Sequence, residues 1–325
     1  MAHAIEARDL VKTYPGGVKA LDKLSFHVAE GTVFGLLGPN GAGKSTAVKI
    51  LTTLSRADSG GASVAGYDVV SQAHQVRHAI GTVQQRSTVD PEATGRENLR
   101  LQGQVYGLRG RSLEARASEL LERFGLADAA DRLVRAYSGG MERRLVVAMA
   151  LVHRPTVLFL DEPTTGLDPE VRADMWTEIA TLSREQGLTI LLTTHYLEEA
   201  DNLASQLAIV DRGHVVAEGT PEGLKADLRG DAIRVELGQP DGDGKVRAAL
   251  GTVNGIREVA VDGREVHARA DDGARAVPVV LQALEARGLE VASVSVARPS
   301  LDDVYLRHTG RSFDKADAEA EEVKR

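Results

Sequence analysis

The sequence predicts an α/β fold in the larger, N-terminal part of the chain and a small α+β domain after it. Three observations predict this division. A short apolar run at Val33–Leu37 enters a glycine-rich loop, and residues with helical spacing follow. Apolar runs typical of buried strands return at residues 157–160 and 189–193. After about Asp227, short apolar alternations take turns with helical spacing, which indicates a separate fold.

Composition narrows the class of protein. At 325 residues the chain has room for about two domains of typical size. Apolar residues make up 42% and charged residues 26%, an ordinary globular mix. The sequence has no cysteine, which excludes disulfides and thiolate metal sites. The formal net charge of -8 argues against a nucleic-acid partner, because phosphate backbones are bound by basic faces.

The sequence contains no apolar run long enough for a membrane span. Its longest clearly apolar stretch, residues 145–152, is far short of the roughly 20 residues that cross a bilayer. The N-terminus carries acidic residues within its first ten positions and lacks the apolar core of a signal sequence. We therefore expect a soluble, cytoplasmic chain, for which any role in transport requires a membrane partner.

Residues 38–46 match a phosphate-binding loop without a mismatch. They are Gly38, Pro39, Asn40, Gly41, Ala42, Gly43, Lys44, Ser45 and Thr46, followed by helical spacing at residues 47–51. The glycines let backbone N–H groups surround phosphates, and the following helix directs its N-terminal partial positive charge at them. We expect Lys44 to reach the β- and γ-phosphates of a bound nucleotide and Ser45 to bind Mg²⁺.

Two adjacent acids follow the apolar run at residues 157–160. Asp161 suits a carboxylate that holds magnesium through water beside the phosphate loop. Glu162 points to the opposite side of an extended chain and suits a general base that polarises the attacking water. Taken alone, the pair fits an ordinary solvated turn equally well. The phosphate loop upstream and the Pro-Thr-Thr-Gly-Leu-Asp segment at residues 163–168 favour the catalytic interpretation.

The segment Tyr137-Ser138-Gly139-Gly140-Met141 resembles the signature motif of ATP-binding cassette (ABC) ATPases. Residues 1 to about 225 are similar to ABC transporter ATPase subunits. The resemblance implies a P-loop NTPase fold, ATP and Mg²⁺ as ligands, and a dimer in which Ser138, Gly139 and Gly140 of one copy complete the ATP site of another. It also implies a separate transmembrane permease and a peripheral position at the cytoplasmic face of the cell membrane. Tyr137 and Met141 depart from the motif's usual leucine and glutamine.

The resemblance extends to single positions elsewhere. Tyr14 is similar to the aromatic residue on which adenine stacks, although a tyrosine there, taken alone, is more often a packing residue. Gln85 is similar to the glutamine that contacts magnesium and couples to the permease, with Gln84 as the rival position. Asp168 is similar to the D-loop aspartate at the dimer seam, and His195 to the switch histidine that senses the γ-phosphate. The resemblance thus implies that Lys44, Glu162 and His195 are the catalytic residues. It implies that Ser45, Gln85 and Asp161 bind the metal.

Changes in composition and in apolar spacing along the sequence predict how the chain divides into domains. We expect an ABC ATPase domain at residues 1–227, with a mainly helical subdomain at about residues 92–150. Residues 232–312 follow a βαββαβ order, which predicts a small ferredoxin-like accessory domain. Residues 313–325 are charged and lack apolar periodicity, which predicts a disordered tail.

Within the family, the chain is most similar to ATPases of daunorubicin/doxorubicin-resistance exporters. The similarity lies at residues 94–99, 196–201 and 299–306, although the last segment also fits a plain amphipathic helix that closes the fold. It implies an ATP-hydrolysing subunit that powers efflux of a drug-like or hydrophobic substrate. An importer ATPase with a ligand-sensing C-terminal domain and a permease-free soluble ABC ATPase remain as alternatives. Arg143 and Arg144 could support the dimer interface, but a solvated basic pair is the more ordinary interpretation.

Overall fold

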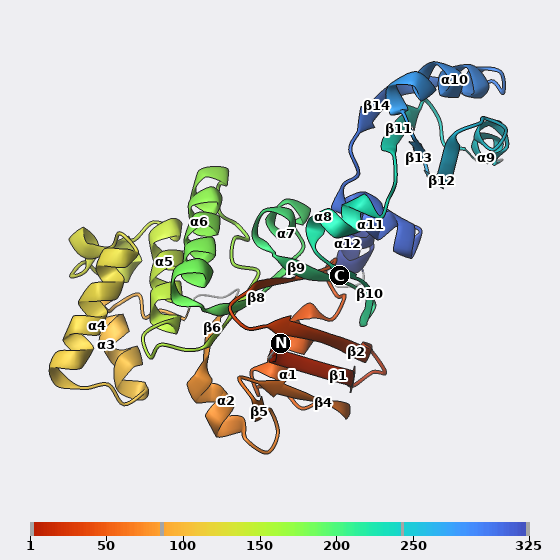
Figure 1. Ribbon diagram of the computed structural model, residues 1–325. Helices are drawn as coiled ribbons and strands as arrows, with labels where there is room; N and C mark the ends of the chain where they lie inside the picture. Colours follow the sequence, from red (N-terminus) through yellow and green to blue (C-terminus); the bar gives the residue numbers. More distant parts are fainter. Residues whose placement is uncertain (1–2, 85–87, 242–243, 323–325) are drawn as a thin grey trace. The chain divides into compact units, whose positions relative to one another are not determined.

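The computed structural model describes residues 3–84, 88–241 and 244–322, and the chain folds into two compact units, Met1–Val215 and Val216–Arg325. Each unit has its own hydrophobic core and is described by itself (Figure 1). In the described part of the chain, no helix combines the length and the apolar character that spanning a membrane requires.

Unit 1 contains two sheets. The first is antiparallel and joins β1 (His3–Thr13), β2 (Lys19–Ala29), β4 (Ser59–Val64) and β5 (Tyr67–Asp68) in the order β2-β1-β4-β5. The second joins β3 (Val33–Leu37), β6 (Ile80–Val83), β7 (Val157–Asp161), β8 (Thr189–Thr194) and β9 (Gln206–Asp211) in the order β9-β3-β8-β7-β6, with all adjacent pairs parallel. β10 (His214–Gly219), within which unit 1 ends, is the neighbour of β9 at the end of the sheet opposite β6.

The parallel sheet is buried on both faces. β3 and β8 are buried at every residue and β7 at all but its last, so their sequences are continuous apolar runs rather than alternations. In the register, Leu37 lies beside Thr194 and Asp161 beside Thr193. The carboxyl ends of β3, β7 and β8 therefore meet at one edge of the sheet, where open α/β sheets bind their ligands.

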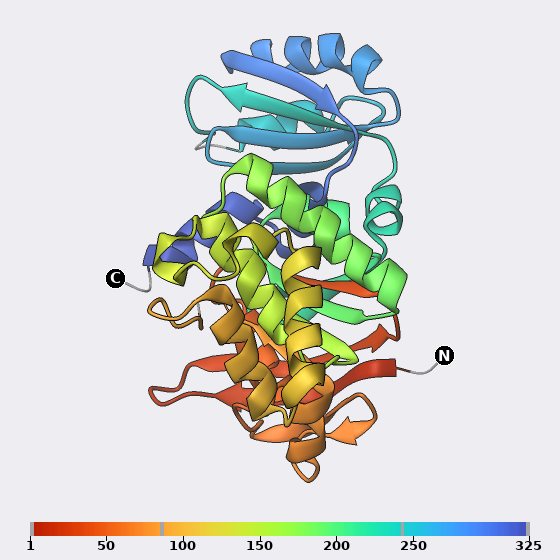
Figure 2. The ribbon, with the colours of Figure 1, turned by 90° about the vertical axis from the view of Figure 1, so that its left-hand side faces the viewer.

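Helices flank the parallel sheet of unit 1. They are α1 (Lys44–Leu51), α2 (Ala73–Ala79), α6 (Pro169–Gln186) and α7 (Leu197–Leu203), together with α3 (Gly95–Val105), α4 (Gly110–Arg123) and α5 (Gly139–Ala150). The last three are neighbours on the side of unit 1 that Figure 2 faces. α3 begins at a capping box, in which Thr94 Oγ1 accepts from Glu97 N at 3.1 Å and the Glu97 carboxylate accepts from Thr94 N at 2.8 Å.

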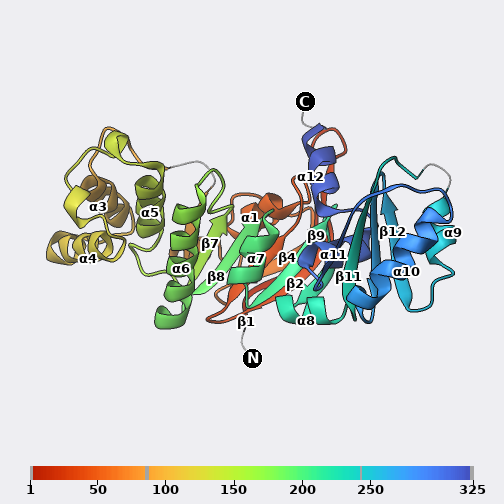
Figure 3. The ribbon, with the colours of Figure 1, turned by 90° about the horizontal axis from the view of Figure 1, so that it is seen from above.

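The first helix of unit 2 is α8 (Pro221–Ala226). A βαββαβ order follows: β11 (Asp231–Leu237), α9 (Lys245–Leu250), β12 (Ile256–Asp262), β13 (Glu265–Ala270), α10 (Gly273–Glu285) and β14 (Val291–Ala297). The four strands form an antiparallel sheet in the order β12-β13-β11-β14, a ferredoxin-like arrangement. Alternate side chains of β11 and β13, such as Ile233 and Val266, pack against α9 and α10 on one side of this sheet (Figure 3).

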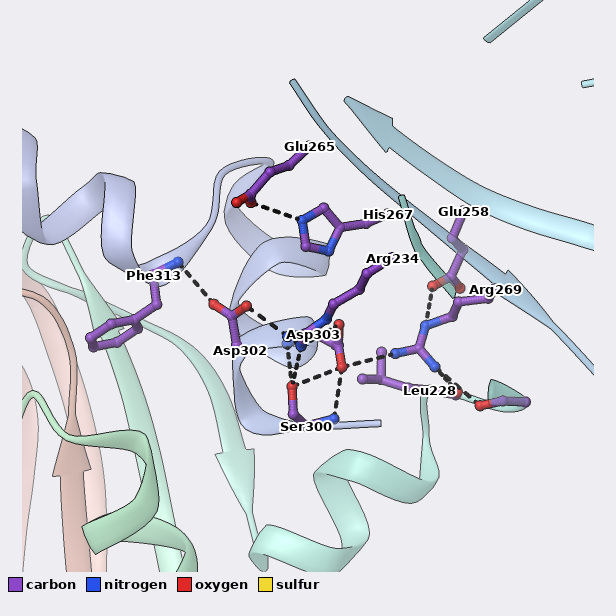
Figure 4. Close-up of polar contacts among 11 residues, drawn as sticks. Leu228, Arg234, Glu258, Glu265, His267, Arg269, Ser300, Asp302, Asp303 and Phe313 are labelled. Atoms are coloured by element: carbon purple, nitrogen blue, oxygen red, sulfur yellow. Dashed lines mark hydrogen bonds and ion pairs between the residues drawn. The ribbon is translucent and has the colours of Figure 1, made fainter. Parts of the chain in front are cut away.

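The opposite face of that sheet carries Arg234, His267 and Arg269, and α11 (Leu301–Thr309) lies against it (Figure 4). Arg234 Nη2 donates to Ser300 Oγ at 3.1 Å, and Arg269 Nη2 lies 3.9 Å from Asp303 Oδ2. Asp303 is buried and also forms the capping box of α11 with Ser300. The segment at residues 299–306 therefore forms the start of a capped helix, and its Asp303 pairs with Arg269 of the sheet.

The end of the chain differs from the sequence prediction. α12 (Phe313–Glu322) is helical where residues 313–325 are predicted to be disordered; residues 323–325 lie outside the described part. Phe313 and Ala316, one turn apart, are buried, and the Phe313 ring lies 5.0 Å from that of Tyr305. Phe313 N also donates to Asp302 Oδ1 at 3.0 Å. These few contacts order the helix. They could not be recognised in a segment that is mostly charged.

Candidate active site

The glycine loop connects β3 to α1 at the carboxyl edge of the parallel sheet. Gly43 has a φ of 109°, in the left-handed region that favours glycine, and a Cβ there would lie 2.4 Å from Ala20 O. α1 begins at Lys44, immediately after this turn and three residues before the predicted helix at 47–51. The first turn of α1 therefore directs its free N–H groups at the loop, an arrangement that binds phosphate.

Lys44 is buried at the start of α1, with its side chain 4% exposed. Its Nζ donates to Gly38 O at 2.6 Å and to Pro39 O at 3.0 Å. The same nitrogen lies 3.9 Å from Glu162 Oε1. The ammonium group can exchange these carbonyl oxygens for phosphate oxygens. A hydrogen bond to a charged phosphate is stronger than one to a neutral carbonyl group.

Ser45 and Asp161 meet where α1 faces the end of β7. Asp161 Oδ1 accepts from Ser45 Oγ at 3.3 Å and from Thr193 Oγ1, at the end of β8, at 2.6 Å. Hydroxyl and carboxylate oxygens are the ligands that Mg²⁺ takes, so this donor set fits a magnesium ion. Gln85, the third expected metal ligand, lies outside the described residues.

Glu162 follows Asp161 with its backbone in the left-handed region, at a φ of 48°. Its N–H donates to Thr193 O at 3.1 Å, and its Oε1 lies 3.3 Å from His195 Nδ1. Contact with His195, assisted by the charge of Lys44, lowers the pKa of Glu162 although burial acts to raise it. The structure thus brings Lys44, Glu162 and His195 together from three separate segments.

Tyr14 lies beside the first turn of α1. Its hydroxyl is 3.4 Å from Thr46 Oγ1, and its ring is half-buried. Lys12 Nζ lies 5.9 Å from the centroid of this ring. A partly exposed aromatic face next to the phosphate loop suits stacking on a nucleotide base.

The signature segment lies on a different part of unit 1. Ser138 caps α5, with its Oγ accepting from Met141 N at 3.3 Å, and both Ser138 and Gly139 are exposed, whereas Gly140 is buried. Asp168 similarly caps α6 by accepting from Val171 N at 3.0 Å. Figures 1 and 3 show α5 well apart from α1. The exposed signature of one chain therefore does not reach that chain's own phosphate loop.

The two departures from the usual signature are both directed inward. The Tyr137 hydroxyl donates to Ala129 O at 2.7 Å. Met141 packs against the apolar cluster that contains Leu145 and Met175. Both substitutions therefore serve the packing of the helical subdomain and leave the exposed Ser138 unchanged.

Two residues that the sequence interpretation left aside support the site. Thr193 holds Asp161 through its hydroxyl and Glu162 through its carbonyl group. Glu199, fully buried, accepts from Thr164 Oγ1 at 2.7 Å and from Trp176 Nε1 at 3.1 Å. A hydroxyl at the end of an apolar strand was the only sequence signal for Thr193. For Glu199 the signal was its place in the family-like segment at residues 196–201.

Comparison with known proteins extends over both units. The family model described as ABC transporter matches residues 21–165. The model described as ATP-binding protein DrrA1-3-like, C-terminal domain, matches residues 219–309.

Relatives match along nearly the whole chain. The daunorubicin resistance ATP-binding protein DrrA2 of Streptomyces coeruleorubidus is 46% identical, over 97% of this chain and 98% of its own. The daunorubicin/doxorubicin resistance ATP-binding protein DrrA of Streptomyces peucetius is 43% identical, over 99% of this chain and 97% of its own. The Nod factor export ATP-binding protein I of Sinorhizobium fredii is 40% identical, over 95% of this chain and 87% of its own.

Solved structures match over about two thirds of the chain. The cbiO1 protein of Clostridium perfringens, part of the ABC transporter complex cbiONQ, is 25% identical with a TM-score of 0.65, over 70% of this chain and 92% of its own. The ATP-binding cassette MJ0796, in a dimeric post-hydrolysis state bound to ADP and phosphate, is 25% identical with a TM-score of 0.61, over 66% of this chain and 98% of its own.

Fold and loop together define a P-loop ATPase of the ABC class. The chain belongs to the ATP-binding subunits of ABC transporters, and within them to the daunorubicin/doxorubicin-resistance type. It binds nucleotide and hydrolyses ATP, as an enzyme of a family whose members work as dimers with a membrane permease.

Proposed function

We propose that this chain uses ATP hydrolysis to power the export of a drug-like or hydrophobic compound through a separate membrane permease. One observation carries the proposal. Lys44, Glu162 and His195 converge on the phosphate loop, whereas Ser138 and Gly139 of the signature stand exposed at the start of α5, apart from α1. One chain thus offers two half-sites, and a second copy is needed to complete them.

In this proposal each half-site has its own set of residues. Gly38, Pro39, Asn40, Gly41, Ala42, Gly43, Lys44, Ser45 and Thr46 surround the phosphates of ATP, Tyr14 stacks on adenine, and Ser45, Gln85 and Asp161 hold Mg²⁺. Bound Mg²⁺ supplies neutralisation of the charge on the β- and γ-phosphates. Ser138, Gly139, Gly140 and Asp168 act on the nucleotide of the opposing copy.

Glu162 serves as the general base. Its lowered pKa keeps the carboxylate ionised at neutral pH, so that it can accept a proton from the attacking water. His195, 3.3 Å from Oε1, orients the carboxylate. Lys44 lies 3.9 Å from the same oxygen and turns to the phosphates when ATP enters. Water forms the new P–O bond, the bond to the β-phosphate breaks, and ADP and phosphate leave.

The permease contact lies on the helical subdomain. α3 exposes Leu101 and Val105, which are 59% and 72% exposed and stand one turn apart on the helix. An exposed apolar pair marks a surface for a partner, and it suits a cytoplasmic helix of a permease. Through this contact the chain works at the cytoplasmic face of the cell membrane.

Direction and substrate class follow from the relatives. Proteins named for daunorubicin resistance, and one named for Nod factor export, are 40–46% identical to this chain, and their similarity includes unit 2. These names favour export over import. The names that refer to daunorubicin and doxorubicin support a drug-like substrate.

Transport by inside-out vesicles tests this proposal. Vesicles from cells that express the chain with its permease should accumulate daunorubicin when ATP is added, detected by quenching of the compound's fluorescence. Vesicles with Glu162→Gln in place of the wild type, or with ADP in place of ATP, are the controls and should show no accumulation. ATP hydrolysis without accumulation of any amphipathic drug, or ATP-driven release from preloaded vesicles, would contradict export.

A further inference from the structure

Arg143 occupies an unexpected environment in α5, shortly after the signature. The guanidinium donates to three backbone carbonyls: Nε to Pro163 O at 2.7 Å, Nη1 to Gln84 O at 2.7 Å and Nη2 to Glu162 O at 3.4 Å. Gln84 follows β6, and Glu162 and Pro163 follow β7. One half-buried side chain therefore joins the signature helix to the ends of two parallel strands, and it is not a member of a solvated basic pair.

The backbone that Arg143 holds is strained. Glu162 has a φ of 48°, and a non-glycine residue stays in the left-handed region only where its surroundings hold it there. On one side, Thr193 O accepts from Glu162 N at 3.1 Å. On the other, the two carbonyls that follow, of Glu162 and Pro163, both accept from Arg143. Arg143 thus stabilises the conformation that directs the Glu162 carboxylate toward His195.

The next residue of the same loop is held from α7. Thr164 Oγ1 donates to the buried carboxylate of Glu199 at 2.7 Å. Burial lowers the pKa of the Arg143 guanidinium, and the negative charges of Glu199 and Asp161 act against that shift. Residues 162–164 are therefore fixed between two helices, and the link to α5 depends on the hydrogen bonds of Arg143.

We propose that Arg143 is a positioning residue that couples the two ATP sites of the dimer. The proposal rests on the proposed roles of Glu162 as general base and of Ser138 as a ligand of the opposing nucleotide. When the signature of one subunit closes on its partner's ATP, the first turns of α5 become fixed. Arg143 then fixes the backbone of Glu162 in the subunit's own site. Binding at one site in this way prepares hydrolysis at the other.

Kinetics of Arg143→Gln in the full-length chain test the coupling. Turnover should fall by about 10- to 100-fold, the scale expected for a small misplacement of a catalytic group. ATP affinity should change by less than about threefold, because Arg143 bonds to residues 84, 162 and 163 rather than to the phosphate loop. The Hill coefficient for ATP should fall toward 1. Arg143→Lys keeps the charge and should restore part of the turnover.

Arg144→Gln is the matched control. Arg144 is the next residue of α5 and lines a surface hollow with Phe124 and Glu178 instead. The Arg144→Gln variant should retain wild-type turnover and wild-type cooperativity for ATP. A wild-type chain that hydrolyses ATP without cooperativity, or an Arg144→Gln variant as defective as Arg143→Gln, would overturn the coupling.

A double-mutant cycle separates positioning from a general structural role. Single-turnover rates are compared for Arg143→Gln, Glu162→Gln and the double variant. If Arg143 acts through Glu162, the double variant should be no slower than Glu162→Gln alone. The proposal would be overturned if the rate of the double variant were reduced by the product of the two single reductions. It would also be overturned if Arg143→Gln lowered the melting temperature and its loss of rate followed from that. Wild-type hydrolysis by Glu162→Gln would instead refute the general base, whatever the effect of Arg143→Gln.

Discussion

At the scale of single residues, Glu162 and Lys44 should separate hydrolysis from binding. Glu162→Gln keeps the shape of the side chain and removes the proton acceptor, so turnover should fall by about 10²–10⁴ while ATP stays bound. Lys44→Ala removes the cation beside the loop and should weaken ATP binding itself. Equilibrium binding of a fluorescent ATP analogue and phosphate release measure the two effects. Near wild-type turnover in Glu162→Gln would place the base elsewhere, and unchanged ATP affinity in Lys44→Ala would contradict its assigned role.

The pH dependence of hydrolysis should report the contact between His195 and Glu162. His195 is the main cause of the lowered pKa of Glu162. In His195→Gln that pKa should rise, so the carboxylate takes up its proton at a higher pH. The acid limb of kcat/KM, which reflects the free enzyme, should therefore move to higher pH.

A matched histidine variant is the control for the predicted shift of the acid limb. His74→Gln, an exposed histidine on α2, should leave the acid limb in place. An acid limb that stays in place in His195→Gln as well, or moves to lower pH, would show that His195 does not control the ionisation of Glu162.

At the scale of elements, α11 should depend on Asp303. Asp303→Ala removes a capping partner of Ser300 and leaves the buried guanidinium of Arg269 with Glu258 as its remaining carboxylate. We expect a loss of about 2–4 kcal/mol in the stability of unit 2, between the usual cost of a lost cap and that of a broken buried pair. Hydrogen exchange of β13 and α11 in the full chain measures it, because exchange resolves local opening.

Asp271→Ala is the control for Asp303→Ala. Asp271 pairs with Arg257 on the surface, where an ion pair contributes about 0–1 kcal/mol. Equal losses of protection in the two variants would mean that the contacts of Asp303 with the sheet contribute no more than an exposed pair does.

At the scale of the whole molecule, residues 232–312 are proposed to keep two subunits associated while the ATP sites are empty. β12 and β14 are the edge strands of the unit 2 sheet. β14 reads Val-Ala-Ser-Val-Ser-Val-Ala, and charge and proline, the usual protection of an edge, are both missing from it. Such a strand can pair with its copy in a second chain.

Sedimentation without nucleotide tests this association. The full chain should sediment as a dimer, and a chain ending at Asp227 as a monomer. Val296 of β14 is 39% exposed, so Val296→Lys in the full chain keeps unit 2 but places a charge on this strand, and it should also weaken the dimer. If the full and shortened chains sediment alike, unit 2 has another task, and ligand sensing becomes the better interpretation.

Much of this molecule could be predicted from local sequence. The phosphate loop, the strand that enters it and the acids at the end of β7 are local patterns, since a glycine loop or a buried strand is encoded by neighbouring residues. The ferredoxin-like order of unit 2 followed from the same kind of pattern. The helix α12 could not be predicted, because Phe313 orders its start through contacts with Tyr305 and Asp302, which lie earlier in the chain.

Local sequence patterns are sufficient to predict the class of protein, the loop that binds phosphate and most of the candidate site residues. Which segments meet depends on how the whole chain packs. This packing placed Glu162 in a left-handed backbone beside His195, it left Ser138 exposed away from the phosphate loop, and it turned Arg143 inward onto the carbonyls that follow β6 and β7. The physical reason is that a loop conformation depends on adjacent residues, whereas a buried hydrogen bond depends on partners brought together by the packing of distant elements.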